Sequence, residues 1–73
     1  MKLKNRLIMA QLLKVVGMDI VRYFRLRFPN AHWSVWLDKA TDRLIEIEGC
    51  KRDVAGRVLR SIIQETDAIG KQE

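Results

Sequence analysis

The side chains best suited to acid–base or nucleophilic chemistry are few in this chain. His32 is the only histidine and Cys50 the only cysteine. Glu46 and Glu48 stand two residues apart, but alternating charges on an extended segment ordinarily form its solvated face. Because general acid–base and nucleophilic catalysis need a positioned base beside the reacting group, we expect no catalytic residues and no enzyme.

The chain also has few residues that could hold a metal ion or a cofactor. One cysteine and one histidine cannot provide the four protein ligands of a structural zinc site, so we expect no metal. The glycines are isolated from one another along the chain, and no glycine-rich phosphate-binding loop is present. We therefore expect no cofactor. A lone cysteine forms no internal disulfide, which suits a reducing cytoplasm.

Basic residues are more informative, and they are unevenly distributed. The 14 Lys and Arg residues outnumber the 9 Asp and Glu residues, for a formal net charge of +5. Residues 1–30 carry seven basic side chains against one acid, a balance of +6, whereas residues 31–73 carry seven against eight, a balance of −1. Such a field favours an acidic partner, which could be a nucleic acid, an acidic protein surface or an anionic membrane. The alternative is that the arginines only keep a small domain in solution.

Two groups of residues are candidate contacts for an acidic protein partner. One is a short basic arm at the start of the chain, and the other combines arginines with aromatic residues, as protein-binding and nucleic-acid-binding surfaces both do. The candidate partner-binding residues are Lys2, Lys4, Arg6, Tyr23, Arg25, Arg27 and Trp36.

A third basic group, Lys51 and Arg52, occupies the predicted first turn of the last helix. Cations there oppose the helix dipole, and a bound phosphate or carboxylate would relieve that conflict. Alternatively, Asp53 offsets the two cations and nothing binds.

Hydrophobic periodicity predicts a helix near each end of the chain. Apolar residues recur at helical spacing from Asn5 to Val16, with Asn5 as N-cap and Gly17 as the closing residue. A single apolar stripe runs from Arg52 to Ile69 and makes the clearest helix of the chain, with Gly70 marking its end.

Between these helices the hydrophobic period changes to two. Residues 20–28 predict a strand that ends at a Pro29-Asn30 turn, and residues 33–37 and 43–48 predict a hairpin around a polar turn at 38–42, with Gly49 ending the sheet. We therefore expect one α+β domain spanning residues 1–73, in the order α-β-β-β-α, with a three-stranded antiparallel meander packed on helices. In this register Trp36 lies exposed on the outer face, whereas a slip of one residue would bury Trp36 and expose Trp33.

Length and hydropathy narrow the class of protein. Seventy-three residues allow one small domain. No apolar run approaches the ~20 residues of a membrane span, and Leu7 to Val16 is interrupted by Gln11 and Lys14. We expect neither a membrane helix nor a secretory signal.

The predicted order of elements resembles that of the double-stranded-RNA-binding domain. Lys51-Arg52 followed by Ala55 is similar to that family's Lys-Lys-x-x-Ala helix start, and residues 29–32, Pro-Asn-Ala-His, are similar to its Gly-Pro-x-His loop. This resemblance implies recognition of duplex RNA by shape. Its candidate anion or nucleic-acid contacts are His32, Lys51 and Arg52.

The chain as a whole resembles the small RNA-polymerase-binding transcription regulators of lytic Xanthomonas phages. The similarity lies in the 73-residue length, the Met-Lys-Leu-Lys-Asn-Arg-Leu opening, the positive charge and the lack of an active-site motif. It implies binding to the N-terminal region of the β′ subunit of host bacterial RNA polymerase, inhibition of initiation through sigma displacement, and antitermination. We adopt this as the leading hypothesis, for a monomer in the host cytoplasm, and keep a small basic nucleic-acid-binding module as the alternative.

Overall fold

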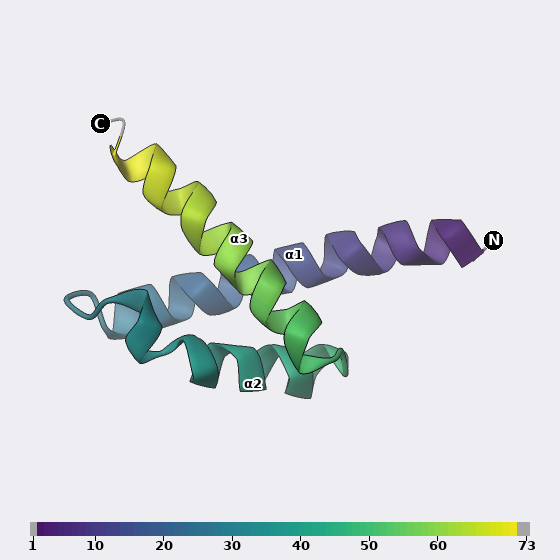
Figure 1. The fold of residues 1–73 in the computed structure, drawn as a ribbon, viewed down its shortest axis with the longest axis horizontal. Helices are drawn as coiled ribbons and strands as arrows, with labels where there is room; N and C mark the ends of the chain where they lie inside the picture. Colours follow the sequence, from purple (N-terminus) through teal and green to yellow (C-terminus); the bar gives the residue numbers. More distant parts are fainter. Residues whose placement is uncertain (1, 72–73) are drawn as a thin grey trace.

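The computed structural model describes the backbone of residues 2–71 and the side chains of residues 10–67. Its elements are α1 (Lys2–Arg27), the 3-10 helix η1 (Trp33–Val35), α2 (Leu37–Glu48) and α3 (Arg52–Lys71). The three α-helices contact one another in every pair, and α3 crosses α1, while the N-terminal part of α1 extends beyond the other two helices (Figure 1). In the described part of the chain, no helix is both long and apolar enough to cross a membrane.

The predicted α+β fold is wrong, because residues 2–71 contain three α-helices and no strand. The segment expected to be the first strand continues α1 to Arg27, and the segments expected to be a hairpin form η1 and α2. β-Branched and aromatic residues favour strands as a group, but packing against neighbouring elements decides their conformation. In α1 the buried residues Leu13, Ile20 and Val21 lie on one helix face, which helical spacing brings together.

Gly17 lies inside α1 and does not close a helix after Val16, as the sequence had suggested. A Cβ atom placed on Gly17 would lie 2.8 Å from Ile62 Cδ1 and 3.4 Å from Val58 Cγ1, both on α3. Gly17 therefore lies where side chains of α3 pack closely on α1, and the absence of a side chain at this position leaves room for them.

The predicted polar turn at residues 38–42 is the first part of α2 instead. Leu37, Ala40, Thr41 and Leu44 are buried at helical spacing. Thr41 is accommodated in the core because its hydroxyl donates a hydrogen bond to the Leu37 carbonyl, at 2.8 Å. Gly49 ends this helix, not a sheet, and its φ of 67° is the left-handed conformation that favours glycine at a helix C-terminus.

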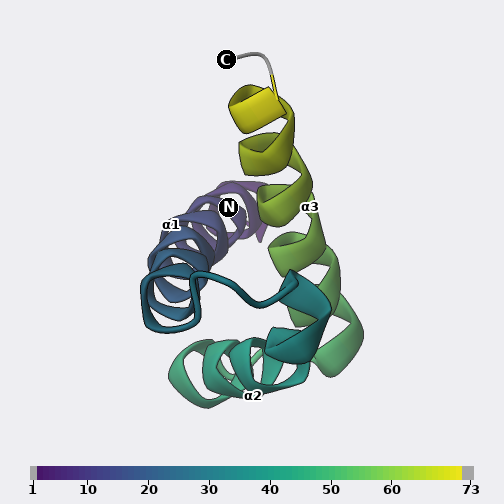
Figure 2. The ribbon, with the colours of Figure 1, turned by 90° about the vertical axis from the view of Figure 1, so that its left-hand side faces the viewer.

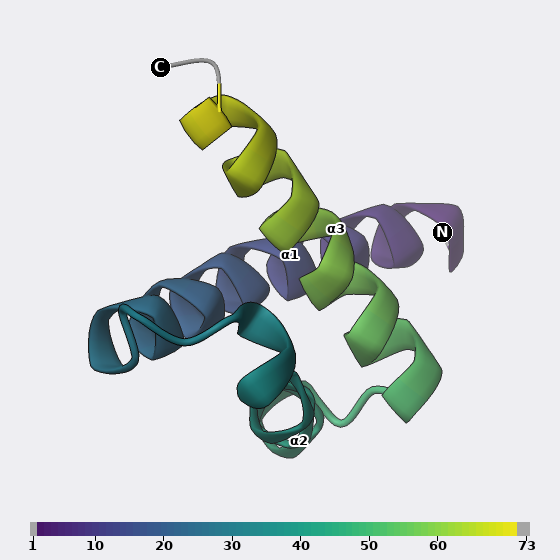
Figure 3. The same ribbon diagram turned by 60° about the vertical axis from the view of Figure 1, so that its left-hand side comes forward.

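The predicted last helix and the predicted turn are confirmed, except that Gly70 lies inside the helix and does not mark its end. α3 begins at Arg52, as expected, and continues through Gly70 to Lys71. After α1, the Ala31 amide donates to the Phe28 carbonyl at 3.2 Å, so Pro29 and Asn30 occupy the centre of a turn that suits both residues. Figure 3 shows this connection leading from the end of α1 to the start of α2.

Trp36 is buried, contrary to its expected place on an exposed sheet face. Its side chain is 2% exposed, and its ring stacks on Phe24 with centroids 5.5 Å apart. Trp33 is partly buried against the same core. The predicted strand register left open whether Trp33 or Trp36 is buried. Helix packing buries Trp36, which lies at the junction of η1 and α2.

Candidate functional site

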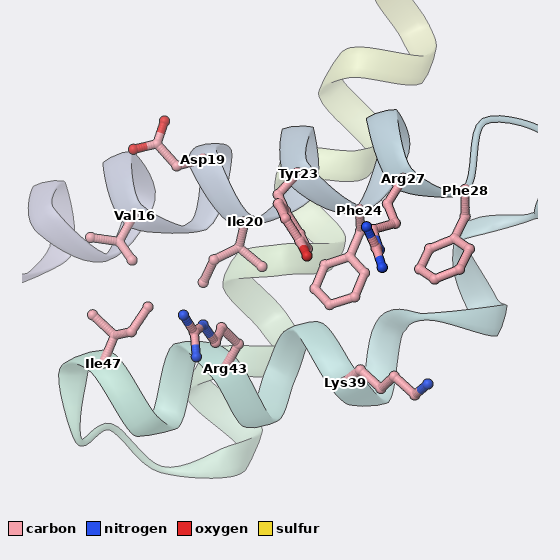
Figure 4. A pocket seen from close by; sticks show the side chains of 10 residues that line it. All are labelled: Val16, Asp19, Ile20, Tyr23, Phe24, Arg27, Phe28, Lys39, Arg43 and Ile47. Atoms are coloured by element: carbon pink, nitrogen blue, oxygen red, sulfur yellow. The ribbon is translucent and has the colours of Figure 1, made fainter.

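One candidate site is a groove of about 770 Å³ between α1 and α2 (Figure 4). We call it the α1–α2 groove. Its lining combines aliphatic and aromatic side chains with three cations and one acid, and consists of Val16, Asp19, Ile20, Tyr23, Phe24, Arg27, Phe28, Lys39, Arg43 and Ile47.

The floor of the groove is apolar because of residue spacing on α1. Val16, Ile20 and Phe24 stand four residues apart, so their side chains follow one helix face. In Figure 4 they point toward α2, where Ile47 lies opposite Val16. Phe28 is 39% exposed and Ile47 is 50% exposed. The groove thus presents accessible apolar surface between two fixed helices, which is typical of binding sites.

The rim of the groove is cationic. Arg27 comes from the last turn of α1, and Lys39 and Arg43 come from α2. Lys39 and Arg43 stand four residues apart and so share one face of α2. With Asp19 as the one acid in the lining, the groove has a formal balance of +2 and favours an acidic occupant.

One of these cations already has a local partner. Arg43 Nη1 lies 3.7 Å from Glu46 Oε2, with 63% and 73% of the two side chains exposed. An ion pair this exposed is screened by water and contributes little to stability, at most about 0.5 kcal/mol. Arg43 can therefore turn to an acidic ligand at small cost.

The structure places two of the predicted partner-binding residues, Tyr23 and Arg27, in this groove. Lys39 and Arg43 were absent from the prediction because residues 38–42 were interpreted as a turn and residues 43–48 as a strand. The signal that could have found them is the buried pattern Leu37, Ala40, Leu44, whose spacing of three and four residues is helical and puts both cations on the same side.

Arg25 is bound by residues of α3, with 40% of its side chain exposed. Its Nη2 atom donates hydrogen bonds to Asp67 Oδ1 at 2.8 Å and to Thr66 Oγ1 at 3.0 Å, and both acceptors belong to α3. Its Nε atom is buried without a hydrogen-bond partner among the described residues. Arg25 therefore ties α1 to α3, while Arg27 two residues later faces the groove.

The residues of the predicted anion site do not come together. His32 precedes η1, and its Nδ1 accepts a hydrogen bond from the Ser34 amide at 3.2 Å. Lys51 and Arg52 follow the opposite end of α2, which is 12 residues long, or about 18 Å. Arg52 donates to Asp42 on α2. Lys51 is exposed.

The predicted basic arm of Lys2, Lys4 and Arg6 belongs to α1 by its backbone. The side chains of these three residues lie outside the described part of the structure. Their proposed contact with a partner stays a prediction.

Neither a metal cluster nor a known relative identifies the site. Within the described residues, no group of three or more His, Cys, Asp or Glu side chains could hold a metal ion. No protein-family model, curated protein or solved structure matches this chain. The similarity to the double-stranded-RNA-binding domain depended on the α-β-β-β-α order, and it loses that basis because residues 2–71 form three helices without strands.

Proposed function

We propose that this protein is a binding module whose α1–α2 groove holds an acidic, amphipathic segment of a protein partner. The observation that carries the proposal is an apolar floor bordered by Arg27, Lys39 and Arg43. An amphipathic helix places apolar side chains on one face and acids beside them, so it matches both parts of the groove. The apolar contacts would supply most of the affinity, and the cations would supply orientation and a faster encounter.

The proposed partner is bacterial RNA polymerase, through the N-terminal region of its β′ subunit. The support for this choice is the sequence resemblance to phage transcription regulators, which rests on length, opening residues and charge and not on the strands that proved wrong. In this proposal the protein acts in the bacterial cytoplasm, inhibits initiation by displacing sigma and promotes antitermination. A cationic, apolar groove is suited to an acidic polymerase surface.

The test is direct binding of purified RNA polymerase, with and without nuclease treatment, to the purified protein at two salt concentrations. The decisive variant is Lys39→Glu with Arg43→Glu, which reverses the α2 side of the rim without touching the Arg25 tie between helices. We expect its affinity to fall about tenfold or more, since each reversed charge replaces attraction by repulsion. Binding by the unaltered protein should weaken as salt is raised.

The matched control is Arg57→Glu with Arg60→Glu, which reverses two exposed cations on α3 outside the groove. It changes net charge by the same amount and should retain most of the affinity. Equal losses in the two variants, or no loss in the groove variant, would remove the groove from the function. If binding is lost after nuclease treatment, the cationic residues bind nucleic acid and not the polymerase itself.

Transcription assays examine the regulatory part of the proposal. The protein should reduce promoter-dependent initiation by sigma-containing polymerase and increase read-through at an intrinsic terminator. The groove variant should lose both effects together with binding. If the protein binds polymerase but changes neither initiation nor read-through, its function is binding alone and not regulation.

A further inference from the structure

The face of α1 that points away from the other helices carries an unusual pattern. Leu12, Val15, Asp19, Arg22 and Leu26 recur at alternating spacings of three and four residues, which keeps them on one helix face. We call this set the outer stripe. Leu12 is 45% exposed, Val15 57% and Leu26 75%. Large exposed apolar side chains aligned on one helix face mark an interaction surface more often than scattered ones do.

The outer stripe is left uncovered by the described fold. Figure 2, which looks nearly along α1, shows α2 on one side of this helix and α3 on another, with its remaining side open. Asp19 points away from α2 in Figure 4. Met18 and Tyr23, exposed by 49% and 57%, flank the stripe and widen its apolar area.

The two charges in the stripe make it self-complementary. Asp19 and Arg22 are exposed, and neither forms an ion pair among the described side chains. In a parallel pair of such helices, equivalent positions meet, so Asp19 would face a second Asp19 and Arg22 a second Arg22. In an antiparallel pair the opposite charges meet twice across a two-fold axis.

We propose that the outer stripe binds the outer stripe of a second copy of this chain, with the two α1 helices antiparallel. Asp19 then contacts Arg22 of the partner subunit on both sides of the two-fold axis. Next to this central layer, Val15 packs against Leu26 of the partner subunit, again twice. Leu12 extends the apolar contact toward the end of the partner's helix. The homodimer replaces the monomer expected from the sequence.

The dimer and polymerase proposals can be tested separately, although Asp19 and Tyr23 of α1 also line the groove. Lys39 and Arg43 of the groove rim belong to α2, whereas the outer stripe belongs entirely to α1. Reversal of the α2 charges should therefore leave self-association unchanged.

The test is sedimentation equilibrium of the purified chain from about 10 µM to about 1 mM, a range that detects dissociation constants typical of weak dimers. We expect a concentration-dependent mass approaching twice the 8.6 kDa of the chain. Asp19→Arg and Arg22→Asp should each weaken dimerisation about tenfold, because each creates two like-charge contacts. The double variant Asp19→Arg with Arg22→Asp restores opposite charges and should restore the dimer.

The apolar layer has its own matched pair of variants. Leu26→Glu should abolish the dimer, whereas Val35→Glu should not, because Val35 is also highly exposed, at 69%, but lies on η1 away from the stripe. A circular dichroism spectrum unchanged by these exposed substitutions verifies folding, and rescue by the double charge swap excludes a general loss of structure.

Two outcomes would overturn the proposal. The first is a monomer at every concentration, and loss of polymerase binding by its Leu26→Glu variant would then assign the outer stripe to the polymerase. The second is a dimer that survives both single reversals and Leu26→Glu.

Discussion

Arg25 of α1 and Asp67 of α3 are 42 residues apart in the sequence, and they form an ion pair. The Arg25 guanidinium donates to the Asp67 carboxylate at 2.8 Å, with 40% and 42% of the two side chains exposed. Thr66 accepts a second bond from the same guanidinium nitrogen. This contact links α1 to α3 near the C-terminal ends of both helices.

Removal of this tie should lower the free energy of unfolding. We expect Arg25→Ala to cost about 1 kcal/mol in urea denaturation, since half-exposed ion pairs are partly screened while the hydrogen bonds still contribute. Asp67→Asn keeps an acceptor oxygen and should cost less. A double-mutant cycle between Arg25→Ala and Asp67→Ala that gives no coupling energy would contradict the contact.

Gly17 and Gly56 should respond in opposite ways to the addition of a side chain. A Cβ at Gly56 meets nothing within 4 Å, so Gly56→Ala should stabilise the protein by about 0.5–1 kcal/mol through helix propensity. At Gly17 a Cβ meets Ile62 at 2.8 Å. Gly17→Leu should therefore destabilise the protein by about 2 kcal/mol or more, because it forces α1 and α3 apart. Thermal unfolding of the two variants is the measurement, and similar shifts would argue against the close crossing.

Gly49 should tolerate substitution poorly for a different reason. A Cβ atom on Gly49 would meet no other atom within 4 Å, but the φ of 67° is unfavourable for residues with a side chain. We expect Gly49→Ala to lower the unfolding free energy by about 1 kcal/mol, and Gly49→Asn to lower it less, because asparagine adopts the left-handed conformation more readily. If alanine and asparagine are equally tolerated, the helix end differs from the one described.

The two tryptophans should be distinguishable by fluorescence. Trp33→Phe leaves Trp36, which is 2% exposed, so its emission should lie at short wavelength and resist quenching by acrylamide. Trp36→Phe leaves the partly buried Trp33, whose emission should be quenched more readily. Trp36→Ala should cost about 3–5 kcal/mol, the usual effect of emptying a core site of this size. Equal quenching in the two phenylalanine variants would contradict the placement of Trp36.

The sequence predicted the last helix well because that helix has an unambiguous pattern. Ala55, Leu59, Ile62 and Ile63 are buried on one face of α3, and polar residues occupy the opposite face. Pro29 and Asn30 likewise predicted their turn through local chemistry. In both cases the residues that determine the helix or the turn lie close together in the sequence.

The prediction failed where two hydrophobic periods fit the same residues. Residues 20–28 are apolar or aromatic at many positions, so both a strand and a helix can present an apolar face. Residues 38–42 contain turn-forming side chains, yet Ala40 and Thr41 are buried in α2. Because no sheet forms, its predicted outer face does not exist. The groove cations Lys39 and Arg43 were missed because their segment was not predicted to be helical.

By itself, the sequence determined the concentration of positive charge in residues 1–30, the final helix and the turn after α1. Only the tertiary structure decided that residues 20–27 continue a helix, that Trp36 is buried, and that Arg25 serves the fold while Arg27 faces the groove. The physical reason is that charge and local turn chemistry act between near neighbours. The choice between two possible hydrophobic faces depends on which distant helix is available to cover one of them.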